Sequence, residues 1–414
     1  MRIAYVAPYH GPTLLRRRPI VRNRSMSAST KMELIATLLQ SRGHEVEIVS
    51  QGEVIENSLT FYPSFAEPER FHPAIPVHYA SVLPVRRLNG AWSDRQTLQL
   101  FKARHRASPY DLVMLYNLKG PQIACANYAL ARRIPVILEY EDDRFVNVVG
   151  EGPTDLLEKY SYRACAKVIA EAAGGIAVSP LLLSKLPADV PKLLLRGIVG
   201  DDLVRAGQRS TASKRNIILF SGTHIQSNGV AELIDAWKMM PVAGWELHIT
   251  GFGGLTDSLR TMAAGIGNLH FDGLVTRQTL VELMSSARIC INPHAVSRTP
   301  GNVFAFKLVE YMAAGAHVIT TPMGVLEQDL EKGMTYMPDN LPATIAGALQ
   351  DVVANRRYEA TAMDAAHQKY GPPAVSSSLD ALVQAVRDRR VTTSSGPARL
   401  SATLTRRATT ASHD

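Results

Sequence analysis

The sequence predicts two α/β domains of the doubly wound type, in which parallel strands alternate with crossover helices. Short apolar runs typical of buried strands alternate with amphipathic segments of helical length along most of the chain. A length of 414 residues, 46% of them hydrophobic and 20% charged, suits two or three ordinary domains. The alternation lapses once, where polar residues gather, and then restarts. We therefore expect an N-terminal domain over residues 1–196, a linker over 197–213, a second domain over 214–372, a returning helix over 373–390 and a disordered tail over 391–414.

The first half of the chain begins with a strand almost at the N-terminus. A helix with leucines and an isoleucine on one side follows, and a glycine ends it. Residues 55–95 are rich in proline and aromatic residues, and we assign no element to them. The predicted strands cover residues 3–7, 46–50, 112–116, 136–140, 176–179 and 192–195, and the predicted helices cover 31–41 and 154–172.

The second half repeats this alternation after the linker. Its strands are short and apolar, and each is followed by a helical pattern. From residue 391 onward no apolar periodicity remains, so we expect no packed structure there. The predicted strands cover residues 216–221, 245–250, 268–271, 289–292 and 317–321, and the predicted helices cover 228–239, 255–264, 277–286, the segment around 307–310 and 379–386.

The overall charge favours an anionic partner. The formal net charge is +8 and the pI is near 9.4. Arginines gather after the first strand, but aromatic residues do not interleave with them, which argues against nucleic acid and leaves anionic lipid head groups, a lipid-linked pyrophosphate or a merely solvated loop. We find no apolar run of about 18 residues and no signal peptide. Three cysteines in apolar contexts, without metal-ligand spacing, are consistent with a reducing cytoplasm.

The most informative segment spans residues 292–321, which we expect to form a turn, a helix closed by Gly315, and a buried strand. Lys307 lies in the first turn of that helix and Glu310 three residues later, so both project from one face. A cation at a helix N-terminus opposes the macrodipole, but free N–H groups at that end favour phosphate. A nucleoside diphosphate between Lys307 and Glu310 satisfies both, with the ribose hydroxyls on Glu310. A surface salt bridge is the alternative.

This segment resembles the donor-binding helix of retaining glycosyltransferases of GT-B family four, in the sub-pattern K-L-x-E-Y-M-A-x-G. The resemblance covers residues 214–345 clearly and 1–50 weakly, and it implies the GT-B fold, two Rossmann-like domains facing across a cleft. The family has an earlier glutamate where this chain has Asn302. Composition alone equally suits a periplasmic-binding-protein layout or a two-domain dehydrogenase. The residues that carry the resemblance are Phe304, Lys307, Leu308, Glu310, Tyr311, Met312, Ala313 and Gly315.

Other loops of the second domain are expected to meet the donor. Gly251 and Gly253 follow a strand and open a helix, where glycines allow a backbone to approach a ligand. The dinucleotide fingerprint G-x-G-x-x-G is absent, because position 256 is threonine, which weakens an NAD interpretation. The resemblance adds that Leu274 and Val275 meet the base, while Thr223 and Asn228 replace a basic pair. The full set of expected donor-binding residues is Glu310, Lys307, Asn302, Val303, Phe304, Gly222, Thr223, Gly251, Gly253, Leu274 and Val275.

The first domain is expected to bind the acceptor. Glu141 and Asp142 end a predicted strand, and sites form at strand carboxyl ends. We assign them, with Lys307, to the chemistry or to sugar hydroxyls; helix N-terminal acidity without chemical consequence is the alternative. Adjacent carboxylates suit Mg²⁺, but the metal-binding D-x-D glycosyltransferases have another fold, so we expect no metal. His44, His224, His294 and His317 show no metal-ligand spacing and are expected to be local hydrogen bonders. The expected acceptor-binding residues are Gly11, Arg16, Arg17 and Arg18.

These expectations combine into a glycosyltransferase that needs no cofactor and uses a UDP- or GDP-sugar as co-substrate. The resemblance implies retention at the anomeric carbon and a polysaccharide, lipid-linked or natural-product acceptor, in the cytoplasm or at the inner membrane face. A nucleotide-sugar epimerase of the same fold remains open, with Glu141 and Asp142 as acid and base. A non-catalytic sugar-nucleotide or glycan-binding module remains open because the earlier glutamate is missing. A DNA-modifying glucosyltransferase is suggested only by the basic charge.

Overall fold

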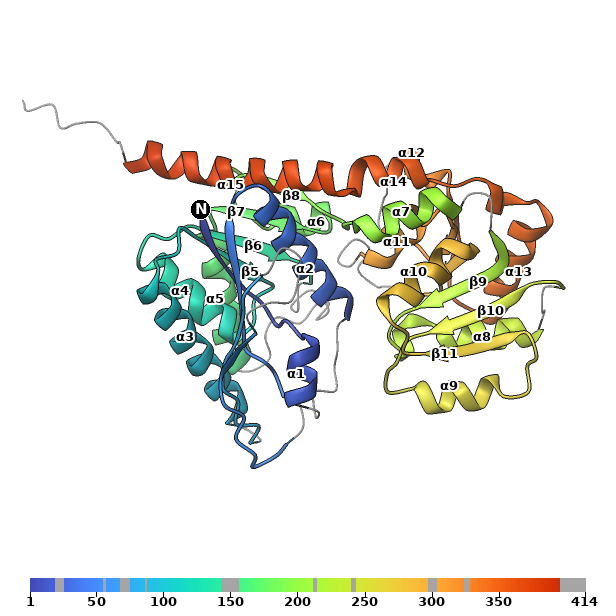
Figure 1. Cartoon of the computed structure of the whole chain (residues 1–414), viewed down its shortest axis with the longest axis horizontal. Helices are drawn as coiled ribbons and strands as arrows, with labels where there is room; N and C mark the ends of the chain where they lie inside the picture. The colour runs from blue at the N-terminus through green and yellow to red at the C-terminus, as the bar shows by residue number, and fades with distance from the viewer. Residues whose placement is uncertain are drawn as a thin grey trace, which may run out of the picture.

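Two lobes, each built on a parallel sheet, make up the molecule (Figure 1). The computed structural model describes residues 1–18, 26–54, 57–67, 75–85, 88–142, 156–210, 214–239, 243–296, 304–323 and 328–394. The chain enters the second lobe after the eighth strand and returns to the first at its end. The predicted architecture of two doubly wound α/β domains is confirmed.

The first sheet has eight strands among the described residues, in the order β3-β4-β2-β1-β5-β6-β7-β8. All neighbours are parallel except β3 and β4. The predicted strands of the first half are all present, and the segment left unassigned contributes β3 and β4 at the sheet edge. The strands are β1 (Arg2–Val6), β2 (Glu45–Ser50), β3 (Phe65–Glu67), β4 (Val77–Tyr79), β5 (Leu112–Tyr116), β6 (Val136–Tyr140), β7 (Gly174–Ala177) and β8 (Lys192–Leu194).

Helices cover both faces of this sheet because neighbouring strand residues point to opposite sides. Ile3 and Tyr5 face the apolar cluster that contains α2, while Ala4 and Val6 face the cluster under α3, α4 and α5. The helices of the first domain are α1 (Pro12–Arg17), α2 (Met26–Ser41), α3 (Asn89–Ala107), α4 (Gly120–Leu130), α5 (Leu156–Ala170) and α6 (Pro180–Ser184).

The second sheet has six parallel strands among the described residues, in the order β11-β10-β9-β12-β13-β14. The predicted strands are confirmed, and β14 was not predicted. Figure 1 shows the carboxyl ends of β9, β10 and β11 directed toward the first domain. The strands are β9 (Arg215–Ser221), β10 (Glu246–Thr250), β11 (Leu269–Gly273), β12 (Ala287–Asn292), β13 (His317–Thr320) and β14 (Met334–Tyr336).

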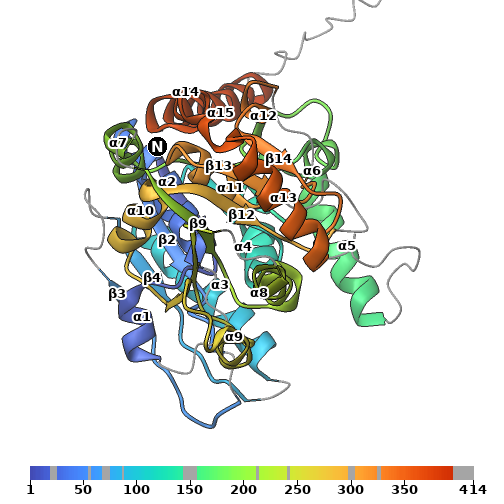
Figure 2. The ribbon, with the colours of Figure 1, turned by 90° about the vertical axis from the view of Figure 1, so that its right-hand side faces the viewer.

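The helices of the second domain also lie on both faces of their sheet (Figure 2). Ile218 and Phe220 face α8 and α13, whereas Ile217 and Leu219 face α10 and α11. The sequence prediction lacked α12, α13 and α14. The helices are α8 (Val230–Met239), α9 (Thr256–Ala263), α10 (Arg277–Ser286), α11 (Phe306–Ala313), α12 (Gln328–Glu331), α13 (Pro342–Ala354) and α14 (Met363–Tyr370), with short 3-10 turns η1 (Gln226–Asn228) and η2 (Arg357–Glu359).

The segment predicted as a linker contains a helix, α7 (Asp201–Ser210). Its polar composition concealed an apolar side: Leu203 is fully buried, and α7 packs against α10 and α11. Upstream of α7 the chain is held to the second domain as well, because the Val199 N–H donates to the Tyr370 carbonyl at 2.8 Å. The crossing between the domains is therefore packed structure, while the exact domain boundaries stay a prediction.

The last described helix, α15 (Pro372–Ser394), leaves the second domain and runs along the first, beside α2 (Figure 1). Arg42 Nη2 donates to Ser377 Oγ at 2.6 Å, and His44 Nε2 lies 3.0 Å from Asp380 Oδ1. The helix continues to Ser394, past the expected end at residue 390. The predicted disordered tail falls mostly on residues 395–414, which lie outside the described residues.

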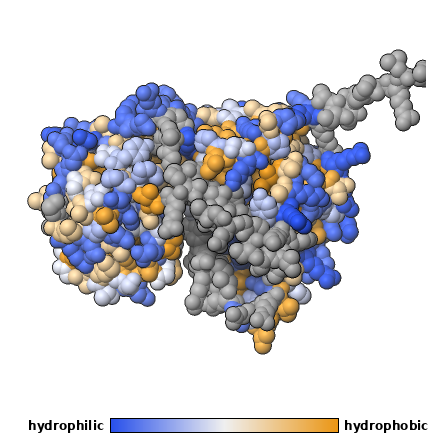
Figure 3. Space-filling view, turned by 180° about the vertical axis from the view of Figure 1, so that it is seen from behind, coloured by the Kyte–Doolittle hydropathy of each residue, from blue (hydrophilic) through white to orange (hydrophobic). Residues whose placement is uncertain are grey.

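On the face shown in Figure 3, polar and apolar side chains are interspersed over both domains. Within the described part of the chain, no helix combines the length and the hydropathy that a membrane span requires.

Candidate functional site

The helix with Lys307 and Glu310 forms as predicted, between a strand end and a glycine. α11 begins at Phe306, so Lys307 is its second residue and Glu310 its fifth. Gly315, with φ +74°, ends the helix before β13. Asn302 and Val303 lie outside the described residues. Phe304, just before the helix, packs its side chain into the core, which anchors the entry of the chain into α11.

Glu310 is 7% exposed and forms an ion pair that the sequence analysis missed. Its Oε1 accepts from Arg277 Nη1 at 2.7 Å, and Arg277 Nε donates to Asp202 Oδ2 at 2.9 Å. Burial raises the pKa of Glu310, and the Arg277 guanidinium opposes that shift without cancelling it. Arg277 on α10 thus fixes the carboxylate, while its other oxygen has no hydrogen bond or ion pair within the described structure. The sequence did hold a signal for Arg277. It is a cation in the first turn of a helix, which is the feature that drew attention to Lys307.

Lys307 has a different environment, although it lies on the same helix. Its Nζ sits 4.5 Å from the centre of the Phe220 ring, and a Cβ placed on Gly222 would meet that nitrogen at 3.1 Å. Burial lowers the pKa of Lys307 to about 7. Among the described residues it has neither a hydrogen bond nor an ion pair, and it makes none with Glu310. An anion placed beside this ammonium would raise its pKa again.

The loops that follow β9, β10 and β11 are joined at one edge of the second sheet. Gly222 N donates to the Thr250 carbonyl at 3.2 Å, and Gly251 N donates to the Gly273 carbonyl at 2.8 Å. A Cβ on Gly251, whose φ is +130°, would lie 1.8 Å from the Gly222 carbonyl oxygen. Glycine is required there because two backbones touch, which is a structural reason in addition to any approach of a ligand.

The remaining expected donor residues lie along the same edge. Gly253 packs against the backbone of His224, where a Cβ would come within 2.4 Å of the His224 carbonyl. Thr223 is exposed, and its carbonyl accepts from Asn228 Nδ2 at 2.6 Å. Leu274, directly after β11, is 58% exposed, and Val275 follows it. The structure therefore brings the expected donor residues of the loops after β9, β10 and β11 to one sheet edge, where Gly222 lies beside Lys307.

Glu141 and Asp142 follow β6 at the carboxyl edge of the first sheet. Asn117, with φ +56°, accepts through Oδ1 from the Glu141 N–H at 2.7 Å and the Asp142 N–H at 3.1 Å. The Glu141 carboxylate pairs with the ammonium of Lys31 on α2, which also lies 3.2 Å from Glu139 Oε1. Burial raises the pKa of Glu141 to about 7, and Lys31 opposes the shift. Glu141 is already paired, whereas Asp142 is exposed.

The three arginines after β1 differ in their exposure to solvent. Arg16 and Arg17 are exposed on the last turn of α1, with the Arg17 guanidinium 4.4 Å from the centre of the Phe65 ring. Arg18 is 1% exposed, and its guanidinium donates to the carbonyls of Gly52, Pro63 and Ala80. The expectation that Arg18 binds the acceptor needs correction, because its donors are used inside the fold.

Two smaller expectations concern Gly11 and the histidines. The Gly11 N–H donates to the Tyr79 hydroxyl at 3.2 Å, so this backbone donor serves the loop after β1. The four histidines do form hydrogen bonds, but only His294 bonds a near neighbour in the chain, the Ala295 carbonyl. The partners of His44, His224 and His317 are distant in sequence and include Asp380, Thr256 and Thr335.

Comparison with known proteins bears on the fold and on the sequence of the second domain. Residues 215–355, about a third of the chain, match the family model described as glycosyl transferases group 1. No curated protein matches the sequence.

Among solved structures, the chain is similar to sucrose-phosphate synthase from Thermosynechococcus elongatus, with a TM-score of 0.61, 14% identity, and coverage of 95% of this chain and 99% of that one. It is also similar to HepE from Anabaena, solved with UDP, with a TM-score of 0.58, 15% identity, and coverage of 95% and 100%. It is similar as well to a putative UDP-N-acetylglucosamine 2-epimerase from Listeria monocytogenes, with a TM-score of 0.58, 10% identity, and coverage of 94% of this chain and 97% of that one. The chain thus has the GT-B fold, and its second domain carries the sequence pattern of group 1 glycosyl transferases.

Proposed function

We propose that this protein is a glycosyltransferase that takes a sugar from a nucleoside-diphosphate sugar and passes it to an acceptor bound by the first domain. The observation that carries the proposal is the pair on α11: a buried carboxylate held by Arg277, and an ammonium without a described partner. The match of the second domain to group 1 glycosyl transferases supports the reaction class. HepE of Anabaena was solved with UDP and with UDP-glucose, which supports a uridine nucleotide over GDP.

Glu310 is proposed to accept hydrogen bonds from the ribose hydroxyls. The carboxylate oxygen that faces Arg277 is occupied, so the ribose uses the other one. Arg277 is a positioning residue in this scheme, because it fixes the carboxylate from α10. Leu274 and Val275, which follow β11 at the same edge, are proposed to contact the base.

Lys307 is proposed to stabilise the leaving group. When the bond between the anomeric carbon and the phosphate oxygen breaks, negative charge develops on that oxygen. An ammonium with a depressed pKa, near the start of a helix, gains most from meeting that charge, because the anion offsets its burial penalty. The backbone N–H groups of residues 302–304 are proposed to add donors to the phosphate, with Asn302 near the sugar. No metal takes part in this scheme, and retention rests on the family resemblance alone.

The first domain is proposed to supply the acceptor site. Arg16 and Arg17 are exposed cations that suit a charged acceptor, such as a lipid-linked pyrophosphate at the inner membrane face. Asp142 is exposed at the end of β6 and is proposed to meet acceptor hydroxyls, with Glu141 and Gly11 lining the same region.

A second candidate is an epimerase that acts on a nucleotide sugar. The Listeria structure, a putative UDP-N-acetylglucosamine 2-epimerase, is as similar in fold as HepE is. Burial brings the pKa of Glu141 to about 7, which suits proton transfer near neutral pH. Proton magnetic resonance of UDP-N-acetylglucosamine, incubated with the protein and no acceptor, separates the two: inversion at C2 favours the epimerase.

The donor site is tested by calorimetric titration with UDP, GDP and UDP-glucose. We expect one of them to bind, and Glu310→Gln to weaken it by about 1.5–3 kcal/mol, because a hydrogen bond to a charged group is lost. Glu282→Gln is the matched control, since Glu282 is exposed on α10 and its carboxylate accepts only from Gln278 Nε2 among the described residues.

Two outcomes would count against the proposal. Failure of every nucleotide to bind the folded wild type removes the donor site. Binding without donor hydrolysis or transfer to any acceptor leaves the non-catalytic sugar-nucleotide module instead.

A further inference from the structure

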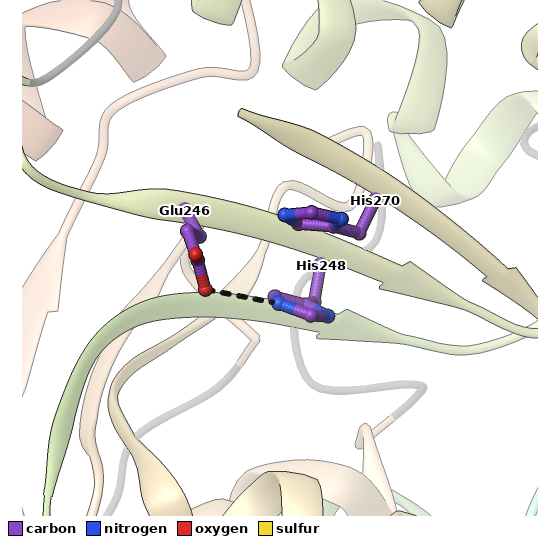
Figure 4. A group of neighbouring side chains, drawn as sticks. All are labelled: Glu246, His248 and His270. Carbon is purple, nitrogen blue, oxygen red and sulfur yellow. Dashed lines mark ion pairs between the residues drawn. The ribbon is translucent and has the colours of Figure 1, made fainter. Parts of the chain in front are cut away.

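Two histidines and a glutamate meet on the outer strands of the second sheet, away from the α11 site. Glu246 and His248 are two residues apart on β10, so their side chains lie on the same face of the sheet. His270 lies opposite His248 on the edge strand β11. The potential ligand atoms of the three side chains all lie within 4.8 Å of one another. Figure 4 shows Glu246 and His248 pointing toward each other, with the His270 ring beside that of His248.

The strand pattern explains why these polar groups share a face. Leu247, Ile249 and Leu269 point to the other side and are buried beneath α8. On its inner flank β10 pairs with β9. On the side of the sheet that carries the cluster, α10 packs against β9, nearer the centre of the sheet. The cluster sits at the outer part of that face, partly exposed, where a small ion has access.

His248 is already oriented as a metal ligand. Its Nδ1 lies 3.0 Å from Asp272 Oδ2, and a carboxylate only accepts, so Nδ1 carries the proton. The lone pair is then on Nε2, which is buried and has no hydrogen-bond partner in the described structure. A carboxylate behind a histidine is the arrangement that fixes the tautomer and ring of metal-bound imidazoles.

The distances between the potential ligand atoms also fit a tetrahedral zinc site. His248 Nε2 lies 3.6 Å from Glu246 Oε2, and the two imidazole rings stack with centres 4.5 Å apart at 25°. Zinc bonds of about 2.0–2.1 Å put tetrahedral ligand atoms roughly 3.4 Å apart. Side-chain rotations cover the remaining difference, since all three residues are only partly buried.

One neighbouring charge competes with a metal ion. Arg215 Nη2 lies 3.2 Å from Glu246 Oε2, but the two side chains are 63% and 40% exposed. Exposed ion pairs of this kind contribute about 1 kcal/mol or less. Arg215 can therefore turn into solvent when a divalent ion takes its place.

We propose that Glu246, His248 and His270 bind a zinc-class transition-metal ion, with Asp272 as the positioning residue for His248 and water in the fourth position. Two imidazoles select such an ion over Mg²⁺ and Ca²⁺, which prefer oxygen ligands. The ion joins the edge strand β11 to β10. Since β11 leads directly into the loop with Leu274 and into Arg277, the bound ion also restrains the loop beside the α11 site.

The test is a titration of the full chain with ZnCl₂, and separately with MgCl₂, followed by calorimetry and thermal unfolding. We expect one equivalent of zinc to bind and to raise the Tm, with no response to magnesium. Cobalt(II) serves as a spectroscopic probe, and tetrahedral visible bands are expected. His270→Gln should abolish stoichiometric zinc binding. Asp272→Asn should weaken it by about 10–100-fold while leaving the stoichiometry intact.

The control variant is Asp257→Asn, which removes a fully exposed carboxylate from α9 of the same domain. It should bind zinc like the wild type. Variants that do not bind zinc are compared with the wild type by circular dichroism, so that a folding defect is recognised. Glu246→Gln provides a second variant that lacks one of the proposed ligands. Absence of stoichiometric zinc binding to the folded wild type overturns the proposal, as does unchanged binding in both His270→Gln and Glu246→Gln.

Discussion

Both domains place an ammonium and carboxylates at the carboxyl edge of their sheet, but they arrange these charges in opposite ways. In the first domain Lys31 lies between Glu139 and Glu141 and is paired with both. In the second, Glu310 is paired with Arg277, and Lys307 faces the Phe220 ring with no hydrogen bond or ion pair among the described residues. Burial lowers the pKa of Lys31, but the two glutamates outweigh it and leave that pKa raised. Burial alone lowers the pKa of Lys307 to about 7.

The difference separates charges that hold the fold from a charge kept for a ligand. A buried ammonium between two carboxylates is satisfied, and removing it leaves buried negative charge behind. A buried ammonium without a partner costs stability, and the cost is recovered when an anion binds. The first of the three predictions that follow compares Lys31 with Lys307, and the other two test Lys307 alone.

The largest effect is expected on stability from Lys31→Met. Its side chain is 3% exposed, and its loss leaves Glu139 and Glu141 buried together without a cation. We expect the free energy of unfolding to fall by about 3–5 kcal/mol, measured by urea denaturation. Lys307→Met is the matched control and should cost little or nothing, because no described ion pair is broken. Equal losses in the two variants would contradict the comparison.

The second effect is expected on turnover from Lys307→Met. If its ammonium meets the leaving phosphate, removing it should slow sugar transfer or donor hydrolysis by about 10²–10³-fold. The rate is followed by release of the nucleoside diphosphate. Lys238→Met, an exposed lysine on α8, should leave the rate unchanged. A rate that survives Lys307→Met within a few-fold would remove this lysine from the mechanism.

The smallest effect is a pair of opposite pH trends. The folded pKa of Lys307, about 7, lies below the ordinary value of 10.5, so between these values the unfolded chain binds more protons. The Lys307 contribution to stability therefore rises as pH increases above 7. Nucleotide affinity should fall over the same range, by at most about tenfold per unit, because the ammonium is lost.

Both trends are isolated by subtracting the same curves of Lys307→Met, measured by urea denaturation and calorimetry from pH 6.5 to about 9. Parallel curves for the two proteins would show that Lys307 stays protonated throughout and that its burial does not matter.

Local sequence was sufficient to predict the scaffold of the donor site. The α11 segment was predicted from its own residues, because a strand end, a first-turn lysine and a closing glycine are all local signals. The alternation of strands and helices likewise predicted the central strands of both sheets, but not the outer strands β3, β4 and β14. It failed at α7, where only a few apolar positions such as Leu203 mark the buried side of a polar helix.

Contacts between distant segments were beyond the reach of local patterns. Arg18 was expected to face a ligand, yet three carbonyls from separate loops enclose it. The zinc-class cluster escaped notice because His248 and His270 come from two strands and meet only through their pairing in the sheet. We expected no metal, because four other histidines show no metal-ligand spacing and the family resemblance implies none.

The sequence by itself determined the order of elements and the position of Lys307 and Glu310 on one helix, since periodicity and helix-end chemistry depend on neighbours in the chain. Only the tertiary structure decided which charges are paired. Lys31 and Glu141 are 110 residues apart, and Arg277 and Glu310 are 33 apart. Such pairing depends on which strand ends the fold brings together, and it leaves one lysine paired and the other without a described partner.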